Sequence, residues 1–157
     1  YFKEIDFSDK GGVIVAFFGA PVSYENNVER ALEFVIALQD ELLPLQIQSG
    51  LQFKVGIAEG IAYAGVIGGL ERSQYAAVGN RVNIAARLCE GAKHSESGVL
   101  ADAGSIAAAD GGTNPASRRA LDSGCYALRE TVQLRGRTQE TEVYELLLGG
   151  SDGTPGC

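Results

Sequence analysis

The chain has 157 residues, of which 45% are apolar and 21% are charged, a composition typical of one globular domain with a buried core. Thirteen basic against twenty acidic side chains give a net charge of −7, which argues against a nucleic-acid-binding protein because such proteins present a basic face. No apolar run approaches the roughly eighteen residues of a membrane span, and no Lys/Arg run suggests binding to an anionic membrane surface.

The three cysteines are odd in number, widely spaced and without a CxxC metal-binding pattern; they are Cys89, Cys125 and Cys157. Reduced thiols in a cytoplasmic protein are the simplest interpretation. Methionine is absent even at position 1, so we expect the chain to be a piece of a longer protein.

A hairpin is predicted at the start of the chain. Residues 1–7 alternate apolar and polar side chains, residues 9–12 supply turn chemistry, and residues 13–18 form a continuous apolar strand.

A helix is expected next, because Asn26 or Asn27 can cap it and Glu29 stands three positions after Asn26, as in a capping box. The pattern ends at about Leu43. Apolar residues recur at helical spacing and predict one buried stripe. They are Val28, Ala31, Leu32, Val35 and Leu42.

The middle of the chain predicts two strands within residues 51–68, joined around Glu59 and Gly60. A second helix follows over about residues 81–93, with Asn80 as its N-cap.

The last third predicts a buried strand and a short helix within residues 97–109, then a loop over 110–124. Residues 126–148 read as two strands around a turn at Gly136, and residues 149–157 as a disordered tail. The order of elements indicates an α+β fold in which helices pack on a mostly antiparallel sheet.

The stretch VGNRVNIAARL is the most informative motif, because it places Asn83 and Arg87 one helical turn apart among small apolar residues. Side chains at i and i+4 share a helix face, and Ala85 and Ala86 let another surface approach closely. A guanidinium presented in this way offers a planar fork of donors suited to phosphate oxygens. From spacing alone, an arginine on a solvated face with a chance asparagine neighbour remains the alternative.

Other signatures of nucleotide binding or hydrolysis do not occur in the sequence. It contains neither GxxxxGK[ST] nor GxGxxG, and no GxSxG nucleophile elbow. The single histidine, His94, follows the second predicted helix in a polar stretch and is interpreted as a solvated surface residue.

Residues 59–88, EGIAYAGVIGGLERSQYAAVGNRVNIAARL, resemble the signature stretch of class III adenylyl/guanylyl cyclase domains. The resemblance continues in VIVAFFGAP, in YENNVERALEFVIALQ and in VQLRGRTQETEVYEL, so it covers residues 1–148. It implies a ferredoxin-like cyclase fold that lacks its first strand and helix here. It also implies two domains paired head to tail, with the nucleotide between them.

In this family the ribose 3′-oxygen attacks the α-phosphorus and pyrophosphate leaves. The resemblance implies that Asn83 orients the ribose and that Arg87 stabilises charge on the transition-state phosphate. The basic residue that holds the triphosphate corresponds to Arg135, with Arg137 as a second candidate. ATP or GTP and a second cyclase domain are therefore the expected partners.

The base pocket departs from the family pattern. The resemblance places it at Glu4, Phe7, Ala76 and Ala77, but Ala76 stands where adenylyl forms have Asp or Thr. Glu4 would suit guanine, yet its usual Cys companion is missing, so the choice between ATP and GTP stays open.

The metal site departs too, because Gly12 stands where the family has its second metal-binding Asp, and glycine offers no oxygen ligand. Asp9 could substitute only if the hairpin register shifted. No metal ligand is therefore assigned to this chain, and Mg²⁺ or Mn²⁺ is expected to be ligated by a partner domain. This pattern resembles the second half of soluble tandem-domain adenylyl cyclases.

Three hypotheses follow. The first is a half-domain that supplies Asn83 and Arg87 to a composite cyclase site in intracellular signalling, inactive by itself. The second is a degenerate, non-catalytic module that regulates a partner cyclase or ATPase domain. The third, an RNA-binding ferredoxin-like module, conflicts with the acidic composition and the lack of aromatic–basic strand motifs.

Overall fold

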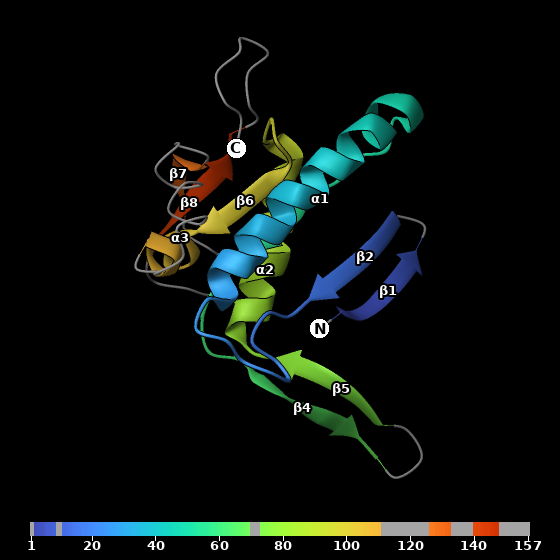
Figure 1. The fold of residues 1–157 in the computed structure, drawn as a ribbon, viewed down its shortest axis with the longest axis vertical. Helices are drawn as coiled ribbons and strands as arrows, with labels where there is room; N and C mark the ends of the chain where they lie inside the picture. The colour runs from blue at the N-terminus through green and yellow to red at the C-terminus, as the bar shows by residue number, and fades with distance from the viewer. Residues whose placement is uncertain (1, 9–10, 70–72, 111–125, 133–139, 148–157) are drawn as a thin grey trace.

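The computed structural model describes residues 2–8, 11–69, 73–110, 126–132 and 140–147 (Figure 1). These residues form a mixed α+β fold, which confirms the predicted fold class. In chain order the elements are β1 (Phe2–Ser8), β2 (Gly11–Ala16), α1 (Asn27–Ser49), β3 (Val55–Ile57), β4 (Tyr63–Gly68), β5 (Ser73–Val78), α2 (Asn80–Gly91), a 3₁₀ turn (Ala92–His94), β6 (Val99–Asp102), α3 (Ala103–Asp110), β7 (Tyr126–Val132) and β8 (Thr141–Leu146).

The strands form one four-stranded sheet and two hairpins. The larger sheet has the order β3-β6-β8-β7, in which β3 and β6 run parallel and the other pairs are antiparallel. The pairs β1–β2 and β4–β5 are antiparallel hairpins. The expectation of a mostly antiparallel sheet with packed helices is therefore met, with one parallel pair at the edge where β3 lies.

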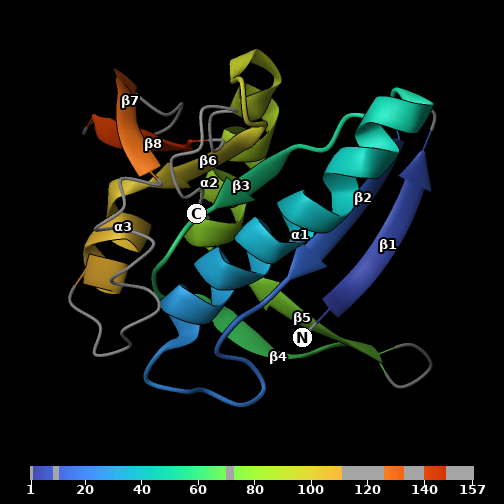
Figure 2. The same cartoon turned by 45° about the horizontal axis from the view of Figure 1, so that its top comes forward.

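The four-stranded sheet is packed on both faces, because successive residues of a strand point to opposite sides. In β6, Val99 and Ala101 join the cluster that contains Leu32 and Val35 of α1. Leu100 between them joins a second cluster, whose other members include Ile84 and Leu88 of α2. The sheet therefore lies between α1 and α2, as Figure 2 shows.

Helix α1 has the predicted stripe, with Leu32 and Val35 buried, but its ends differ from expectation. Asn26 is the N-cap yet makes no side-chain capping bond, so the capping box does not form. The helix also runs six residues beyond Leu43, through Pro44, to a left-handed Gly50. Pro44 is tolerated because it lies on the exposed side of the helix, where water can solvate the carbonyl left without a donor.

The region after α1 differs most from the sequence analysis. The two strands expected within residues 51–68 exist, but each pairs elsewhere: β3 with β6, and β4 with β5. Strand β5 was not predicted. Helix α2 begins at Asn80 with Gly79 as its N-cap, so Asn80 is not the cap, and its α-helical part ends at Gly91.

The remaining expectations on fold are met where they can be followed. The buried strand and short helix are β6 and α3, and the closing hairpin is β7–β8. His94 is exposed, as expected. The loop 110–124, after its first residue, and the tail 149–157 lie outside the described residues.

An ion pair ties β7 and β8 to the turn after α2. Glu145 accepts hydrogen bonds from the Ser97 backbone (3.0 Å) and hydroxyl (3.2 Å), and from the Arg129 guanidinium (2.7 Å). Arg129 also donates to the carbonyl of His94. Partial burial by itself raises the pKa of Glu145, but the bonds from Ser97 and Arg129 outweigh it and lower that pKa below 4.5.

We expect the free energy of unfolding to fall when the pH drops below about 4.5. Because the pKa of folded Glu145 is lowered, its contribution is complete above the unfolded value and is lost as pH falls through the folded value. Urea unfolding between about pH 3 and about pH 6 measures this slope. The Glu145→Gln variant should show a shallower slope, and an unchanged slope would contradict the assignment.

Candidate functional site

Helix α2, which carries the Asn–Arg motif, packs on the sheet with almost no space between backbones. A Cβ added to Gly56 of β3 would lie 2.0 Å from the carbonyl oxygen of Ala85 and 2.4 Å from the amide nitrogen of Cys89. On the same side Ile84 and Leu88 are buried, at 1% and 2% exposure. The depth of α2 against the sheet is therefore set by a glycine.

The two motif residues lie on the part of α2 that is not in the core. Asn83 is exposed and Arg87 is partly exposed, one turn further along. Neither side chain is among the buried residues of the two core clusters. Both residues are therefore at least partly accessible from outside the chain, as a shared nucleotide site requires.

The predicted base-pocket residues lie in β5 and β1. Ala76 and Ala77 lie in β5, on the strand that leads directly into α2, and are buried at 4% and 7% exposure. Glu4 and Phe7 are in β1, where Phe7 pairs with Gly12 of β2. A single residue, Gly79, separates the end of β5 from the start of α2, so Ala76 and Ala77 lie close in sequence to the motif helix.

The predicted triphosphate ligands Arg135 and Arg137 lie outside the described residues, as does Asp9. The roles proposed for Arg135 and Arg137 therefore stay predictions.

The described residues do not fit a metal site. Gly12 lies in β2 opposite Phe7, so the position of the family's second metal ligand carries no oxygen-bearing side chain. Within the described ranges, no three His, Cys, Asp or Glu side chains lie close enough together to hold a metal ion. We therefore assign no metal-dependent step to this part of the chain.

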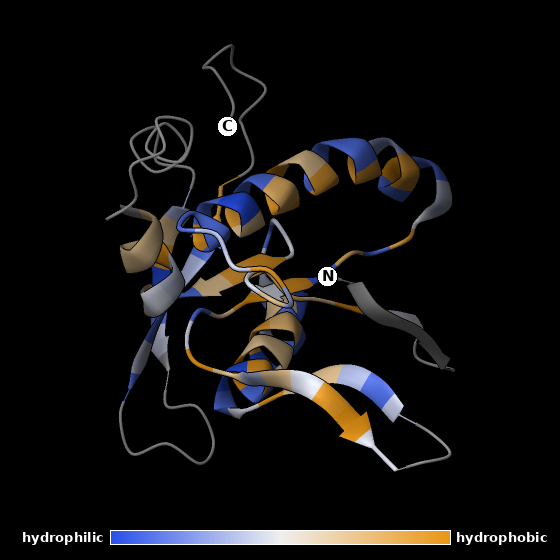
Figure 3. Cartoon of the chain, turned by 60° about the horizontal axis from the view of Figure 1, so that its bottom comes forward, coloured by the Kyte–Doolittle hydropathy of each residue, from blue (hydrophilic) through white to orange (hydrophobic). Residues whose placement is uncertain are grey.

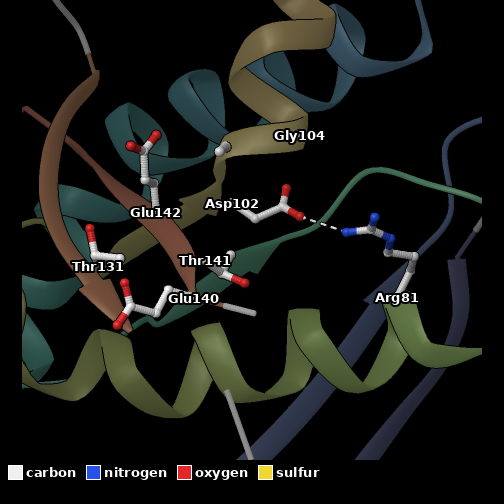
Figure 4. A pocket seen from close by; sticks show the side chains of 8 residues that line it. Arg81, Asp102, Gly104, Thr131, Glu140, Thr141 and Glu142 are labelled. Carbon is white, nitrogen blue, oxygen red and sulfur yellow. Dashed lines mark hydrogen bonds and ion pairs between the residues drawn. The ribbon is translucent and has the colours of Figure 1, made fainter. Parts of the chain in front are cut away.

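A polar cluster that the sequence did not predict lies beside the start of α2. A cavity of about 490 Å³ is lined by Arg81, Asp102, Ala103, Gly104, Thr131, Glu140, Thr141 and Glu142. Figure 4 shows the Arg81 guanidinium directed at Asp102, with a nitrogen–oxygen distance of 2.9 Å. The signal in the sequence was the Asp-x-x-Ser spacing of Asp102 and Ser105 after a buried strand, which is typical of a helix N-cap.

The β4–β5 hairpin exposes large apolar side chains. Tyr63 is 67% exposed and Val66 69%, and Ile61, two residues before β4, is 97% exposed. Figure 3 shows hydrophobic residues at the end of β4, on the hairpin that projects beyond α2. Clustered apolar exposure of this kind is typical of a surface that another protein covers.

None of the helices in the described part of the chain is both long enough and apolar enough to span a membrane.

Comparison with known sequences gives one family. The family model of the adenylate and guanylate cyclase catalytic domain matches residues 10–145. The uncharacterised protein Rv1319c of Mycobacterium tuberculosis is 35% identical over 136 residues, which cover 85% of this chain and 23% of that protein. Rv1320c of the same species is 36% identical over 135 residues, covering 83% and 21%. The chain thus spans less than a quarter of these relatives.

Two solved structures share the fold. The guanylyl cyclase Cya2 superposes with a TM-score of 0.65 at 23% identity, over 98% of this chain and 74% of that one. The adenylyl cyclase CyaB of P. aeruginosa gives 0.64 at 22% identity, over 96% and 74%.

Proposed function

The chain belongs to the family of adenylate and guanylate cyclase catalytic domains, and from this premise we infer that it forms one half of a composite nucleotide cyclase site. The reaction would convert ATP or GTP into the 3′,5′-cyclic nucleotide and pyrophosphate. The observation that carries the proposal is the placement of Asn83 and Arg87, one turn apart on α2 and outside the core.

The chemical role of this half is to orient substrate and stabilise charge. The ribose 3′-oxygen attacks the α-phosphorus, and the bond to the pyrophosphate oxygen breaks. The Asn83 amide hydrogen-bonds the ribose and fixes the direction of attack. The Arg87 guanidinium donates to the phosphate oxygens on which negative charge develops, and such fixed donors lower the barrier by several kcal/mol. Arg135 and Arg137 are proposed to hold the triphosphate.

The second half of the site is proposed to come from another cyclase domain. Cyclases of this family use Mg²⁺ or Mn²⁺, and the glycine at position 12 leaves the ligands to a partner. The apolar side chains that project from β4–β5 support pairing, because burying them would stabilise a dimer. An acidic chain without a basic run gives no support for nucleic acid or a membrane as a partner.

A second candidate function is favoured by the two positions at which the chain departs from the family pattern. Gly12 has no ligand oxygen and Ala76 has no polar atom to read a base, so the chain can be a non-catalytic module that regulates a partner domain. The two functions differ in one respect. Only the composite enzyme needs the Arg87 guanidinium for turnover.

Purified alone, the chain is expected to form no cyclic nucleotide from ATP or GTP with Mg²⁺ or Mn²⁺, because it lacks the carboxylates that this chemistry needs. Mixed with a cyclase domain that carries both metal-binding aspartates, it should produce cyclic nucleotide above the level of that domain alone. Chromatographic detection of cyclic AMP and cyclic GMP measures both. Clear turnover by the isolated chain would refute the division of the site.

A further inference from the structure

The Arg81–Asp102 ion pair joins the helix that carries Asn83 and Arg87 to the junction of β6 and α3. We propose that this pair is a positioning device: it fixes the rotation of α2 on the sheet and thereby aims Asn83 and Arg87 at the nucleotide. The inference rests on the proposed function and adds Arg81 and Asp102 to it as positioning residues.

The two carboxylate oxygens of Asp102 have separate partners. Oδ1 accepts hydrogen bonds from the backbone amide (3.0 Å) and the hydroxyl (2.6 Å) of Ser105, in the first turn of α3, and from the Glu59 amide (3.4 Å). Oδ2 accepts from the Arg81 guanidinium (2.9 Å). Because Asp102 is 1% exposed, its position is fixed by the core. Oδ1 therefore holds α3 and the segment that contains Glu59, and Oδ2 holds α2.

Arg81 is close to the motif in sequence and covers the turn after β3. It precedes Asn83 by two residues, in the first turn of α2. Gly60 has a φ of +142°, and a Cβ added there would lie 2.4 Å from Nε of Arg81. The side chain therefore crosses directly over Gly60 to reach Asp102, as Figure 4 shows for the guanidinium and carboxylate.

The position of Arg81 is poor for the stability of α2 itself. A cation in the first helical turn opposes the positive end of the helix dipole, and α2 has neither an acidic first-turn residue nor a side-chain N-cap to offset it. Asp102 is buried and the Arg81 side chain is 29% exposed, and an ion pair that desolvates a carboxylate in this way adds little net stability compared with an apolar pair of the same size. Orientation of α2, with Gly56 setting its depth, is the function that this placement serves.

A double-variant cycle separates positioning from stability. Arg81→Leu leaves the Asp102 carboxylate buried and unpaired, so its melting temperature should fall. Asp102→Asn keeps one oxygen for Ser105 and Glu59 but removes the charge. The double variant Arg81→Leu/Asp102→Asn should regain most of the lost melting temperature, because no unpaired charge remains.

In that cycle kcat is not expected to recover together with the melting temperature. Paired with the metal-bearing domain, the double variant should keep its KM within about twofold and lose about tenfold to a hundredfold in kcat, because a small misplacement of catalytic groups has that effect. Hydrogen exchange of amides in the first two turns of α2 should stay faster than in the parent chain. Arg81→Lys, which keeps a donor and a charge, should retain part of the parent chain's kcat and part of its hydrogen-exchange protection in α2.

Arg129→Leu is the matched control. Like Arg81, Arg129 pairs with a carboxylate, that of Glu145, and its side chain is 24% exposed against 29% for Arg81, but it lies beside the residues that follow α2. Its loss should lower stability and leave exchange in the first turns of α2 unchanged.

The outcomes distinguish this inference from the proposed function. Recovery of kcat and of α2 protection together with stability in the double variant would overturn the positioning role, as would unchanged exchange in Arg81→Leu. If Arg81→Leu does not fold, the double variant and Arg81→Lys provide the test of the positioning role. If the parent chain gives no activity with its partner, the proposed function fails, and exchange still tests the positioning of α2.

Discussion

Replacing Gly56 with alanine is expected to displace or unfold helix α2. The added methyl carbon would lie 2.0 Å from the carbonyl oxygen of Ala85 and 2.4 Å from the amide nitrogen of Cys89, and both are backbone atoms that cannot rotate away. Overpacking in a tight core costs about 1 to 3 kcal/mol, and a backbone-to-backbone clash lies at or above the upper end. Urea unfolding measures the loss, and reconstituted cyclase activity should fall with it.

The matched control is Gly69→Ala. Gly69 follows β4, and a Cβ added there meets nothing within 4 Å, so stability should change by about 0.5 kcal/mol or less. The comparison isolates the steric contact, because both variants add the same methyl group. A Gly56→Ala chain as stable as the Gly69→Ala chain would show that α2 is not held at the described depth.

Replacing Arg87 with alanine is expected to abolish most of the turnover of the composite site while the fold survives. Loss of one fixed donor to developing charge lowers kcat by about a hundredfold to a thousandfold. Because Arg87 is only partly buried, the melting temperature should change little compared with the change in kcat. Steady-state kinetics with the metal-bearing partner give kcat and KM separately.

Lys93→Ala provides the control for charge alone. Lys93 is an exposed basic residue in the 3₁₀ turn after α2, outside the proposed site, so its loss should leave kcat near that of the parent chain. Unchanged turnover in Arg87→Ala would refute the composite enzyme and favour the regulatory module, whose effect on its partner does not require a transition-state donor.

Local sequence patterns predicted the elements whose structure depends mainly on their own residues. The 3.6-residue spacing of apolar residues located α1, and the i,i+4 relation placed Asn83 and Arg87 on one side of α2, away from buried Ile84 and Leu88. By contrast, Ser73–Val78 was missed because its two alanines give it a weak strand signal, and it becomes β5 by pairing with β4.

Features that join distant residues could not be predicted from one sequence. Arg81 and Asp102 are 21 residues apart, and nothing local to either indicates that they meet. The end of α1 was misjudged for a related reason. Pro44 normally signals the end of a helix, but here its position on the exposed side makes the missing hydrogen bond tolerable. Whether a proline ends a helix, or an arginine pairs with a distant carboxylate, depends on tertiary contacts that the local sequence does not contain.

The apolar β4–β5 hairpin has a consequence for the amount of protein in a cell. With Val66 of β4 69% exposed, a copy that is not paired with the proposed second domain would present the kind of surface that chaperones and proteases recognise. Unassembled copies are therefore expected to be degraded faster than assembled ones. The steady-state abundance of the two halves would then be linked, so that neither accumulates far beyond the other.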